Sequence, residues 1–314
     1  MKILVTDGLE SEALARLKER HEVDAIEASP QQLLDLIGKY EAVIVRGRTK
    51  VTADVIAKGT KLRVIARAGV GVDNIDVAAA TKRRIPVVNA PAASTISVAE
   101  LTFGHMLSLA RHIPQADRSV KAGRWDKKAF EGTELYGKTL GLVGSGRIGA
   151  EVASRAKAFG MRVIAYDPYL PPKAAEERGI ALTTLEAVLL DSDFVSIHAA
   201  LTDETRGMIG AKQLALLKKS AYVVNCARGE VVDEGALAEA LRDGRIAGAA
   251  LDVYAKEPPV SSPILAVENT SLTPHIAAST KEAQERVGTM IAGEVLRVLA
   301  GEKPSSAVNP MVDP

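Results

Sequence analysis

The sequence predicts an α/β protein with two doubly wound domains, each built on a mostly parallel sheet with helices on both faces. Three observations lead to this prediction. Short apolar runs alternate with helical patterns along the chain, which is typical of parallel sheets with crossover helices. The 314 residues are enough for about two domains. A glycine-rich turn between two apolar runs lies near residue 140 and not at the N-terminus.

The first third of the chain predicts one complete α/β sheet. We expect strands at residues 2–6, 22–26, 42–45, 62–66 and 86–89. We expect the helices between them at residues 10–20, 30–38, 53–58 and 77–83. This segment lacks the glycine-rich turn, so we assign it to a domain of its own.

A second βαβ series begins at Thr139. Further strands are expected at 163–166, 194–198, 222–226, 248–253 and 270–273. The SVAE sequence at 97–100 resembles a capping box that opens a long helix through Arg111, and residues 281–300 predict the last helix. The late position of the glycine turn indicates an inserted domain. We therefore predict one domain from residues 1–96 and 285–314 and a second from residues 97–284.

The turn near residue 140 has the GxGxxG pattern, with Gly144, Gly146 and Gly149 between an apolar run and a helical stretch. The first glycine permits a tight turn, the second lets the backbone approach a pyrophosphate, and the third lets helix and sheet pack closely. Asp167 ends the next apolar run, where a carboxylate can bind a ribose 2′-hydroxyl and repel a 2′-phosphate. The unit predicts a Rossmann domain that binds NAD; glycines that only tighten a βα turn are the alternative.

Composition restricts the partners and the compartment. Charged residues make up 25% and the formal net charge is +1, so neither nucleic acid nor a membrane is expected as a partner. The single cysteine, Cys226, excludes an internal disulfide and fits a reducing compartment. The N-terminal apolar stretch is too short for a signal peptide, and no stretch approaches the ~20 apolar residues that span a bilayer. We expect a cytoplasmic protein without a metal site.

Three residues in the second half have side chains suited to a small hydroxy acid. Arg228 follows a strand, at the sheet edge where α/β proteins bind ligands, and its guanidinium suits a carboxylate; a surface arginine at a helix end is the alternative. His275 follows Pro274 and has the pKa range of a base for a hydroxyl proton. A carboxylate such as Glu257 favours the imidazolium and fixes its tautomer. His21, His105 and His112 are expected to be structural.

The N-terminal half supplies candidate anion contacts. Gly69 and Gly71 follow a strand and expose consecutive N–H groups that can form an anion nest; a simple strand-to-helix turn is the alternative. Arg46 and Arg48 follow another strand and, with Arg67, predict a positive cluster suited to a doubly charged substrate. Solvated loop charges are the competing explanation.

With these residues assembled, the chain resembles the D-isomer-specific 2-hydroxyacid dehydrogenase family over nearly its whole length. The sequences GSGRIG with Asp167, NCARGEVVDE, ALDVYAKEPP and TPHIAAST match that family's signatures in order and approximate spacing. The resemblance implies a Rossmann NAD-binding domain inserted into a flavodoxin-like substrate domain, with the active site in the cleft between them. It also implies a homodimer, formed through the long helix after Ser97 and the segment around Trp125.

The resemblance also implies residue roles. Arg228 would bind the substrate carboxylate and carbonyl, His275 would be the acid–base, and Glu257 its carboxylate partner. Other substrate contacts are expected from Arg46, Arg48, Arg67, Gly69, Val70 and Gly71. Contacts to NAD are expected from Val70, Gly144, Gly146, Arg147, Ile148, Gly149, Asp167, Cys226, Ala227, Arg228, Asp252, His275, Ala277 and Ala278.

Further matches, VIVRGRTKVTADVI and RVIARAGVGVDNID among them, resemble family members that oxidise D-3-phosphoglycerate to 3-phosphohydroxypyruvate in L-serine synthesis. Two departures are Ala199-Ala200 in place of a common Thr-Pro, and Ala92-Ala93-Ser94 in place of Asn-Gly-Asn. A glyoxylate or hydroxypyruvate reductase, which needs no phosphate site, is the alternative, and an NAD-sensing co-repressor is a third. Because the chain stops soon after its last helix, we expect no serine-sensing regulatory domain.

Overall fold

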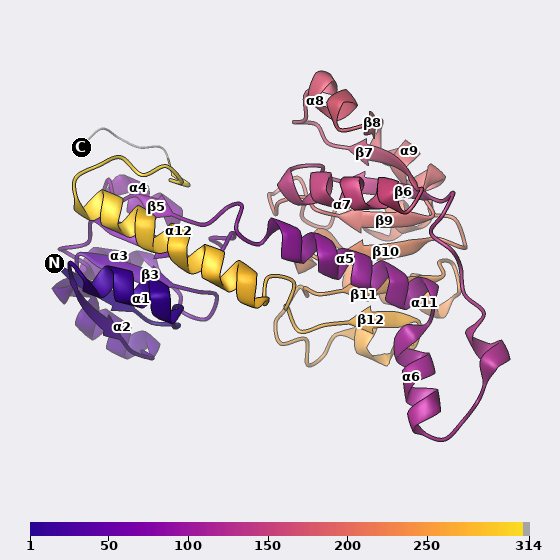
Figure 1. The fold of residues 1–314 in the computed structure, drawn as a ribbon, viewed down its shortest axis with the longest axis horizontal. Helices are drawn as coiled ribbons and strands as arrows, with labels where there is room; N and C mark the ends of the chain where they lie inside the picture. Colours follow the sequence, from indigo (N-terminus) through magenta and orange to yellow (C-terminus); the bar gives the residue numbers. More distant parts are fainter. Residues whose placement is uncertain (310–314) are drawn as a thin grey trace. The chain divides into compact units, whose positions relative to one another are not determined.

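The computed structural model describes residues 1–309, which form two compact units. The first unit comprises Met1–Ser94 together with the segment from Ser279 onward, and the second comprises Thr95–Ala278. Each unit contains one parallel sheet (Figure 1). The predicted α/β class is therefore confirmed, and the second unit is inserted into the chain of the first.

The first unit is built on a five-stranded sheet in the order β2-β1-β3-β4-β5. Every neighbouring pair in it is parallel. This is the flavodoxin-like strand order. The strands are β1 (Lys2–Val5), β2 (Glu22–Ala25), β3 (Ala42–Val45), β4 (Val64–Arg67) and β5 (Val87–Val88). The helices are α1 (Ser11–Lys18), α2 (Pro30–Leu36), α3 (Ala53–Lys58), α4 (Val77–Lys82) and α12 (Lys281–Leu299), with the 3₁₀ turn η1 (Ile37–Lys39).

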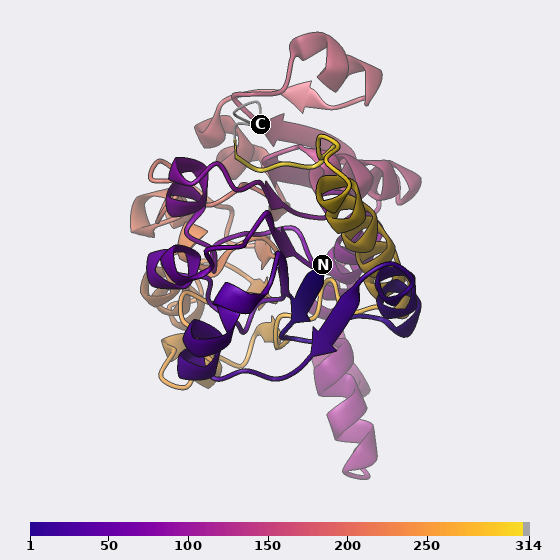
Figure 2. The same ribbon diagram turned by 90° about the vertical axis from the view of Figure 1, so that its left-hand side faces the viewer.

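Alternate residues of the first sheet face two separate hydrophobic layers. Ile3 and Val5 face the layer that α1 and α12 cover, whereas Leu4 faces the layer beneath α2, α3 and α4. This alternation follows from the two-residue period of a strand. Figures 1 and 2 show α12 lying beside α1, so segments far apart in the sequence share one core.

The second unit is built on a seven-stranded sheet in the order β12-β11-β10-β9-β6-β7-β8. Read from β8, it is the Rossmann order with one further strand. The strands are β6 (Thr139–Val143), β7 (Arg162–Tyr166), β8 (Ala181–Leu182), β9 (Phe194–Ile197), β10 (Tyr222–Asn225), β11 (Gly248–Leu251) and β12 (Thr270–Leu272).

Helices cover both faces of the second sheet. The layer formed by Leu140, Leu142 and Phe194 packs against α5 (Thr95–Ala110) and α7 (Arg147–Ala158). The opposite layer packs against α9 (Leu185–Asp191), α10 (Ala211–Leu214) and α11 (Glu234–Arg242). The remaining elements are α6 (Ile113–Lys121), α8 (Pro172–Glu177), η2 (Lys127–Phe130), η3 (Gly229–Val231) and η4 (Pro263–Ala266). None of the helices within residues 1–309 is long and apolar enough to cross a membrane.

The expected strands and helices of the first third are all present, with small shifts at some of their ends. The prediction of a capping box at 97–100 is wrong. Helix α5 begins at Thr95, so Ser97 lies inside its first turn. The Glu100 carboxylate lies 3.8 Å from the Arg155 guanidinium of α7. Strand β8 was not predicted, because two residues on a sheet edge carry no periodic pattern.

Candidate active site

The glycine turn connects β6 to α7. Gly144 has φ of +88°, and a Cβ atom there would lie 2.9 Å from the backbone of His198 and Ala199. Only glycine tolerates both constraints. A Cβ on Gly146 would meet nothing within 4 Å, and no side chain caps the N-terminus of α7. The loop thus leaves open space in front of backbone N–H groups at a helix N-terminus, which fits a pyrophosphate.

Asp167 follows β7 directly, and its carboxylate is fixed beside the glycine turn. Oδ2 accepts a hydrogen bond of 2.7 Å from Ser145 N, and Oδ1 accepts bonds of 2.9 and 3.1 Å from Tyr169 N and Leu170 N. The Ser145 hydroxyl lies at 3.3 Å, a weak contact that a ribose hydroxyl can replace. A carboxylate with about four acceptor sites therefore keeps room for one ribose hydroxyl and opposes a 2′-phosphate.

His275 and Glu257 form a hydrogen-bonded pair at the carboxyl edge of the same sheet. Nδ1 of His275 lies 2.8 Å from Oε2 of Glu257. Because a carboxylate only accepts, Nδ1 carries the proton and Nε2 is left for a ligand. The hydrogen bond that His275 donates to Glu257 raises the pKa of His275 above its usual 6.5, against the effect of burial. Burial acts to raise the pKa of Glu257, but the contacts with His275, the Tyr254 N–H and the Arg228 charge together outweigh it and lower that pKa.

The backbone around His275 is held by Asp252, at the end of β11. His275 has φ of 55°, a left-handed conformation that costs about 1–2 kcal/mol for a residue with a Cβ. Its N–H donates to the Asp252 carbonyl at 2.8 Å. The N–H groups of Ile276 and Ala277 donate to the two carboxylate oxygens of Asp252, each at 2.8 Å. Strain of this kind persists where surrounding contacts over-determine it, as is frequent at active sites.

Arg228 leaves the end of β10 on a loop shaped by Asn225. The Asn225 amide donates to the Arg228 carbonyl at 2.8 Å and accepts from Ala227 N at 3.0 Å. Gly229 then packs against Tyr254, where an added Cβ would lie 1.9 Å from a backbone atom. The Arg228 charge lowers the pKa of both Glu257 and His275 as a lesser cause, so this cation lies close enough to act on the pair.

The other expected NAD contacts of the second unit vary in exposure. Arg147 is exposed and Ile148 is half-buried, whereas Gly149, Cys226, Asp252 and Ala277 are buried. Burial raises the pKa of the Cys226 thiol to about 12. Cys226 is therefore an uncharged thiol at neutral pH.

In the first unit, the expected substrate residues lie at the carboxyl edge of the sheet. Arg67 ends β4, and its guanidinium folds back to donate to the Ala68 carbonyl at 2.6 Å. Val70 is 36% exposed, and its carbonyl accepts a bond of 2.6 Å from the Asn89 amide. The Gly69 carbonyl accepts from Ala90 N at 2.9 Å. These bonds fix the loop through Gly71.

Arg46 and Arg48 are already paired with carboxylates. Arg46 contacts Glu10 at 2.7 Å and also donates to Gln284. Arg48 contacts Asp7 at 3.3 Å and Glu27 at 3.1 Å. The cluster that the sequence predicts as free positive charge is therefore largely neutralised within the first unit.

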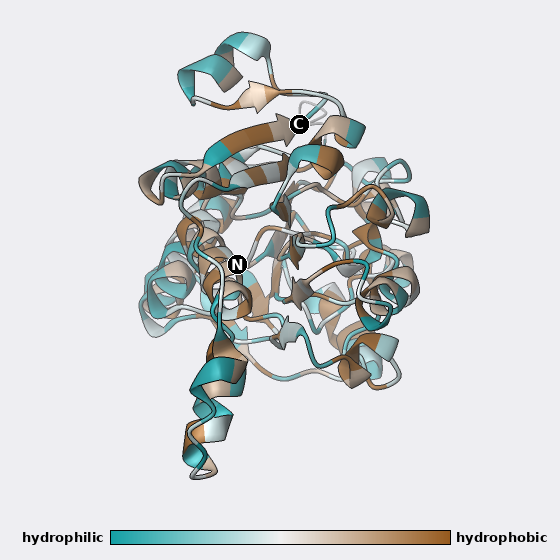
Figure 3. Ribbon diagram, turned by 90° about the vertical axis from the view of Figure 1, so that its right-hand side faces the viewer, coloured by the Kyte–Doolittle hydropathy of each residue, from teal (hydrophilic) through white to brown (hydrophobic). Residues whose placement is uncertain are grey.

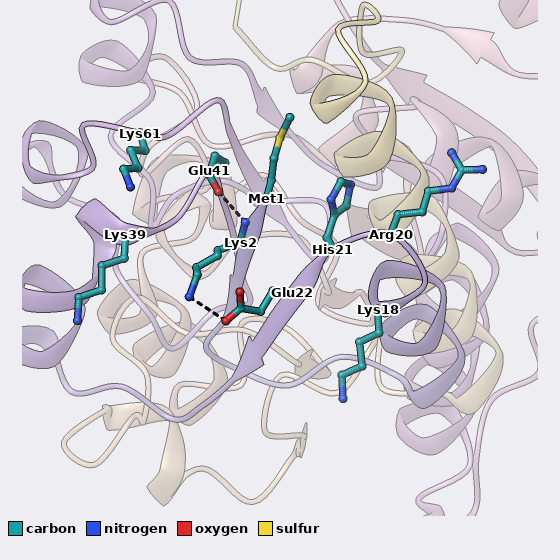
Figure 4. A pocket seen from close by; sticks show the side chains of 9 residues that line it. All are labelled: Met1, Lys2, Lys18, Arg20, His21, Glu22, Lys39, Glu41 and Lys61. Atoms are coloured by element: carbon teal, nitrogen blue, oxygen red, sulfur yellow. Dashed lines mark hydrogen bonds and ion pairs between the residues drawn. The ribbon is translucent and has the colours of Figure 1, made fainter.

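An open basic hollow lies at the opposite, amino-terminal edge of the first sheet (Figure 4). Lys18, Arg20, Lys39 and Lys61 line it around the Lys2–Glu22 ion pair. Lys18 and Lys39 occupy the last turns of α1 and η1, where cations interact favourably with the helix dipole. Ligands of open α/β sheets bind at the carboxyl edge instead, so we do not assign this hollow to the active site. Within residues 1–309, no cluster of His, Cys, Asp or Glu could hold a metal ion.

Sequence reasoning missed the groups that orient the candidate site. Asp252 is predicted to contact NAD, and in the structure its carboxylate also accepts the Ile276 and Ala277 N–H groups. Asn225 and the hydroxyl of Thr273, which donates to Asp252 at 2.6 Å, were not selected. Only the position of Asn225 and Thr273 at strand ends could have drawn attention to them.

The geometry and the comparisons together define the class of protein. Residues 103–277 match the family model described as D-isomer specific 2-hydroxyacid dehydrogenase, NAD binding domain. This match covers more than half of the chain, which therefore belongs to that family of NAD-dependent oxidoreductases. NAD is the cofactor. The glycine turn and Asp167 fit it, and would hold its pyrophosphate and adenosine ribose.

Individual relatives are similar over nearly the whole chain. D-3-phosphoglycerate dehydrogenase of Methanocaldococcus jannaschii is 53% identical over 98% of this chain and 59% of its own length. The chain thus spans about three fifths of that relative. The crystal structure of the TT0316 protein from Thermus thermophilus is 37% identical, with a TM-score of 0.92 over 98% of this chain and 100% of that one. D-lactate dehydrogenase from Aquifex aeolicus, solved with NAD and lactic acid, is 30% identical, with a TM-score of 0.86 over 96% of each chain.

Proposed function

We propose that this chain catalyses the NAD-dependent oxidation of D-3-phosphoglycerate to 3-phosphohydroxypyruvate, the first step of L-serine synthesis. The observation that carries the proposal is the His275–Glu257 pair at 2.8 Å, with the Arg228 charge acting on both groups. The name of the relative that is 53% identical supports the substrate.

The residues of the second unit perform the proton chemistry. Nε2 of His275 takes the proton of the C2 hydroxyl, while Glu257 stabilises the imidazolium that forms. The Arg228 guanidinium binds the substrate carboxylate in a forked contact. When bound, NAD would supply the hydride acceptor for C2. In the reverse direction, protonated His275 returns the proton to the carbonyl oxygen.

In this proposal, the first unit recognises the rest of the substrate. The N–H groups from Gly69 to Gly71, with Val70 between them, bind the carboxylate. Arg67, Arg46 and Arg48 bind the phosphate, and Arg46 and Arg48 exchange part of their contacts with Glu10 and Asp7 to do so. The first unit is thus assigned as the substrate domain and the second as the NAD domain.

A glyoxylate or hydroxypyruvate reductase is the second candidate. It needs Arg228, Glu257 and His275 but no phosphate site. The pairing of Arg46 and Arg48 with carboxylates favours it. The two candidates therefore differ in the first unit and share the second.

Steady-state rates decide between these two candidates. We expect kcat/KM with 3-phosphoglycerate to exceed that with glycerate, and the reverse rate with phosphohydroxypyruvate to exceed those with hydroxypyruvate and glyoxylate. A hydrogen bond from the protein to the substrate phosphate contributes about 1.5–3 kcal/mol, which corresponds to roughly 10- to 100-fold in kcat/KM. A preference for the unphosphorylated acids would overturn the phosphoglycerate assignment and leave the dehydrogenase chemistry standing.

We also propose that the chain forms a homodimer in the cytoplasm, through α5, α6 and the segment around Trp125. Figure 1 shows α6 and this segment extending away from the second sheet, and Figure 3 shows a few hydrophobic residues on the otherwise hydrophilic α6. Ile113, Val120 and Trp125 are 50%, 56% and 83% exposed. Light scattering should give a dimer for the native chain and a monomer for Val120→Asp with Trp125→Ala. A native monomer would contradict this proposal.

A further inference from the structure

A chain of polar side chains runs from helix α5 to the backbone of His275, all within the second unit. His105 on α5 is 2% exposed. Its Nδ1 lies 3.0 Å from the Ser271 hydroxyl and its Nε2 lies 3.1 Å from the Thr273 hydroxyl. Helix α5 packs across β10, β11 and β12 (Figure 1), and residues 271 and 273 face it together because strand side chains alternate.

The Asp252 carboxylate, at the end of this series of side chains, determines the direction of each hydrogen bond in the series. Both oxygens of Asp252 accept N–H groups, so the Thr273 hydroxyl donates its only proton to Asp252, at 2.6 Å. The Thr273 oxygen must then accept from His105, which places the ring proton on Nε2. Nδ1 of His105 consequently accepts from the Ser271 hydroxyl. Burial lowers the pKa of His105 below its usual value, in keeping with this neutral ring.

Asp252, the last side chain of this hydrogen-bonded series, contacts the strained loop that carries His275. Asp252 must place its two oxygens so that Oδ1 receives Ile276 N–H and Oδ2 receives Ala277 N–H. Thr273 is the side chain that contacts Oδ1 at hydrogen-bond distance. Without a donor toward the Thr273 oxygen, the Thr273–Asp252 hydrogen bond loses its cooperative strengthening, so the carboxylate is held less firmly. His105 supplies the donor.

We propose that His105 is a positioning residue: through Thr273 and Asp252, it holds the backbone at 275–277 so that Nε2 of His275 presents itself to the substrate. The proposal rests on the proposed role of His275 as the acid–base. His105 touches neither substrate nor NAD in this scheme. It couples the buried face of α5 to the reacting edge of the sheet, and it gives a chemical reason for a histidine inside a helix otherwise lined by mostly apolar side chains.

The test uses three single variants, the double variant His105→Leu with Thr273→Val, and one matched control, with His275→Asn measured alongside. His105→Leu removes both hydrogen bonds, Thr273→Val removes the link to Asp252, and His105→Gln retains an N–H that can donate to Thr273. Met106→Leu is the control, because Met106 is 0% exposed on the same helix and has no polar group to lose. Amide hydrogen exchange of the segment containing Ile276 and Ala277 is measured on the protein without added cofactor, and kcat, KM and the pH profile are measured with NAD.

For His105→Leu and Thr273→Val, we expect exchange at Ile276 and Ala277 to accelerate and kcat to fall, each by about tenfold, the worth of one net hydrogen bond. KM for NAD should stay unchanged, and the double variant should lose no more than Thr273→Val alone, because both act through one contact. His105→Gln should recover most of kcat. Should His105→Leu fail to fold, Thr273→Val and His105→Gln decide by the same measurements.

Two outcomes overturn the proposal: exchange and kcat in His105→Leu that match Met106→Leu, or additive losses in the double variant. His275→Asn is measured alongside. If His275→Asn keeps full turnover, the acid–base assignment fails, and a change of exchange in His105→Leu then reports the loop contact alone. If His275→Asn is inactive and His105→Leu matches the control, only the positioning role fails.

Discussion

Nδ1 of His275 donates to Oε2 of Glu257 over 2.8 Å, and no described residue hydrogen-bonds the opposite ring nitrogen. The carboxylate decides which nitrogen carries the proton. It also raises the pKa of the imidazole above 6.5. The contact with Glu257 therefore fixes which ring nitrogen of His275 faces a ligand and also raises its proton affinity, in the group that we assign as the acid–base.

Replacing His275 by Asn should remove proton transfer and leave NAD binding intact. General acid–base catalysis contributes about 10²- to 10⁴-fold, so we expect kcat to fall by that factor. Fluorescence titration with NADH should give an unchanged dissociation constant. His112→Asn, a histidine at the start of α6, serves as the control. Turnover at the native rate in His275→Asn would remove histidine as the acid–base.

Replacing Glu257 by Gln should move the pH dependence of activity. Oxidation requires neutral His275, so its rate falls as pH drops through the His275 pKa, whereas reduction requires the imidazolium and its rate falls as pH rises. Glu257 raises that pKa by its hydrogen bond and its charge. Glu257→Gln should therefore shift both limbs of kcat/KM to lower pH, with a loss of at least about tenfold. Limbs that stay in place would contradict the assigned pairing.

The same pair predicts a pH dependence of stability. The pKa of His275 is raised above 6.5, so its contribution is complete below about 6.5 and is lost as pH rises through the folded value. The pKa of Glu257 is lowered from 4.5, so its contribution is complete above about 4.5 and is lost as pH falls through the folded value. The difference in Tm between the native chain and Glu257→Gln should be largest between these two pH values. A difference that does not vary with pH would exclude the ion pair as its cause.

Much of the fold and of the candidate site follows from local sequence. The apolar runs identify the strands, and a parallel sheet brings the residues after β10, β11 and β12 to one edge, where Arg228, Glu257 and His275 lie. The glycine turn is visible for the same reason: its chemistry is contained in a few consecutive residues. These features depend on spacing along the chain and on a sheet topology with few alternatives.

The remaining features depend on contacts between distant segments. Arg46 meets Glu10 and Gln284, and His105 meets Ser271 and Thr273, pairs that no local pattern identifies. The capping box predicted at 97–100 is wrong for a related reason. Its four residues are equally compatible with a helix interior, and the start of α5 two residues earlier gives Glu100 a partner on another helix.

Asp167 should determine the preference for NAD over NADP. Its carboxylate faces the glycine turn through Ser145 N at 2.7 Å, where it opposes a 2′-phosphate. Asp167→Asn keeps the size and removes the charge, and Asp167→Ala removes both. We expect the ratio of kcat/KM for NAD over NADP to fall by about tenfold or more, the worth of one hydrogen bond plus the lost repulsion. Asp203→Ala, an exposed carboxylate of the same unit, is the control, and an unchanged ratio in both Asp167 variants would remove this residue from cofactor selection.

Arg228 should affect the affinity for the acid far more than the affinity for NAD. A forked guanidinium–carboxylate contact is worth about 1.5–3 kcal/mol, or roughly 10- to 100-fold. Arg228→Gln should lower kcat/KM for the hydroxy acid by that factor. The kcat/KM of Arg228→Lys should lie between those of the native chain and Arg228→Gln, since lysine keeps the charge but cannot form the forked contact. Arg206→Gln is the matched control, because the Arg206 side chain is 58% exposed and its ion pair with Glu230 is long, at 4.0 Å. In both Arg228 variants, the affinity for NADH should change less than kcat/KM for the acid. Arg228→Lys with native kcat/KM would show that the charge alone suffices, and Arg228→Gln with native kcat/KM would remove Arg228 from substrate binding.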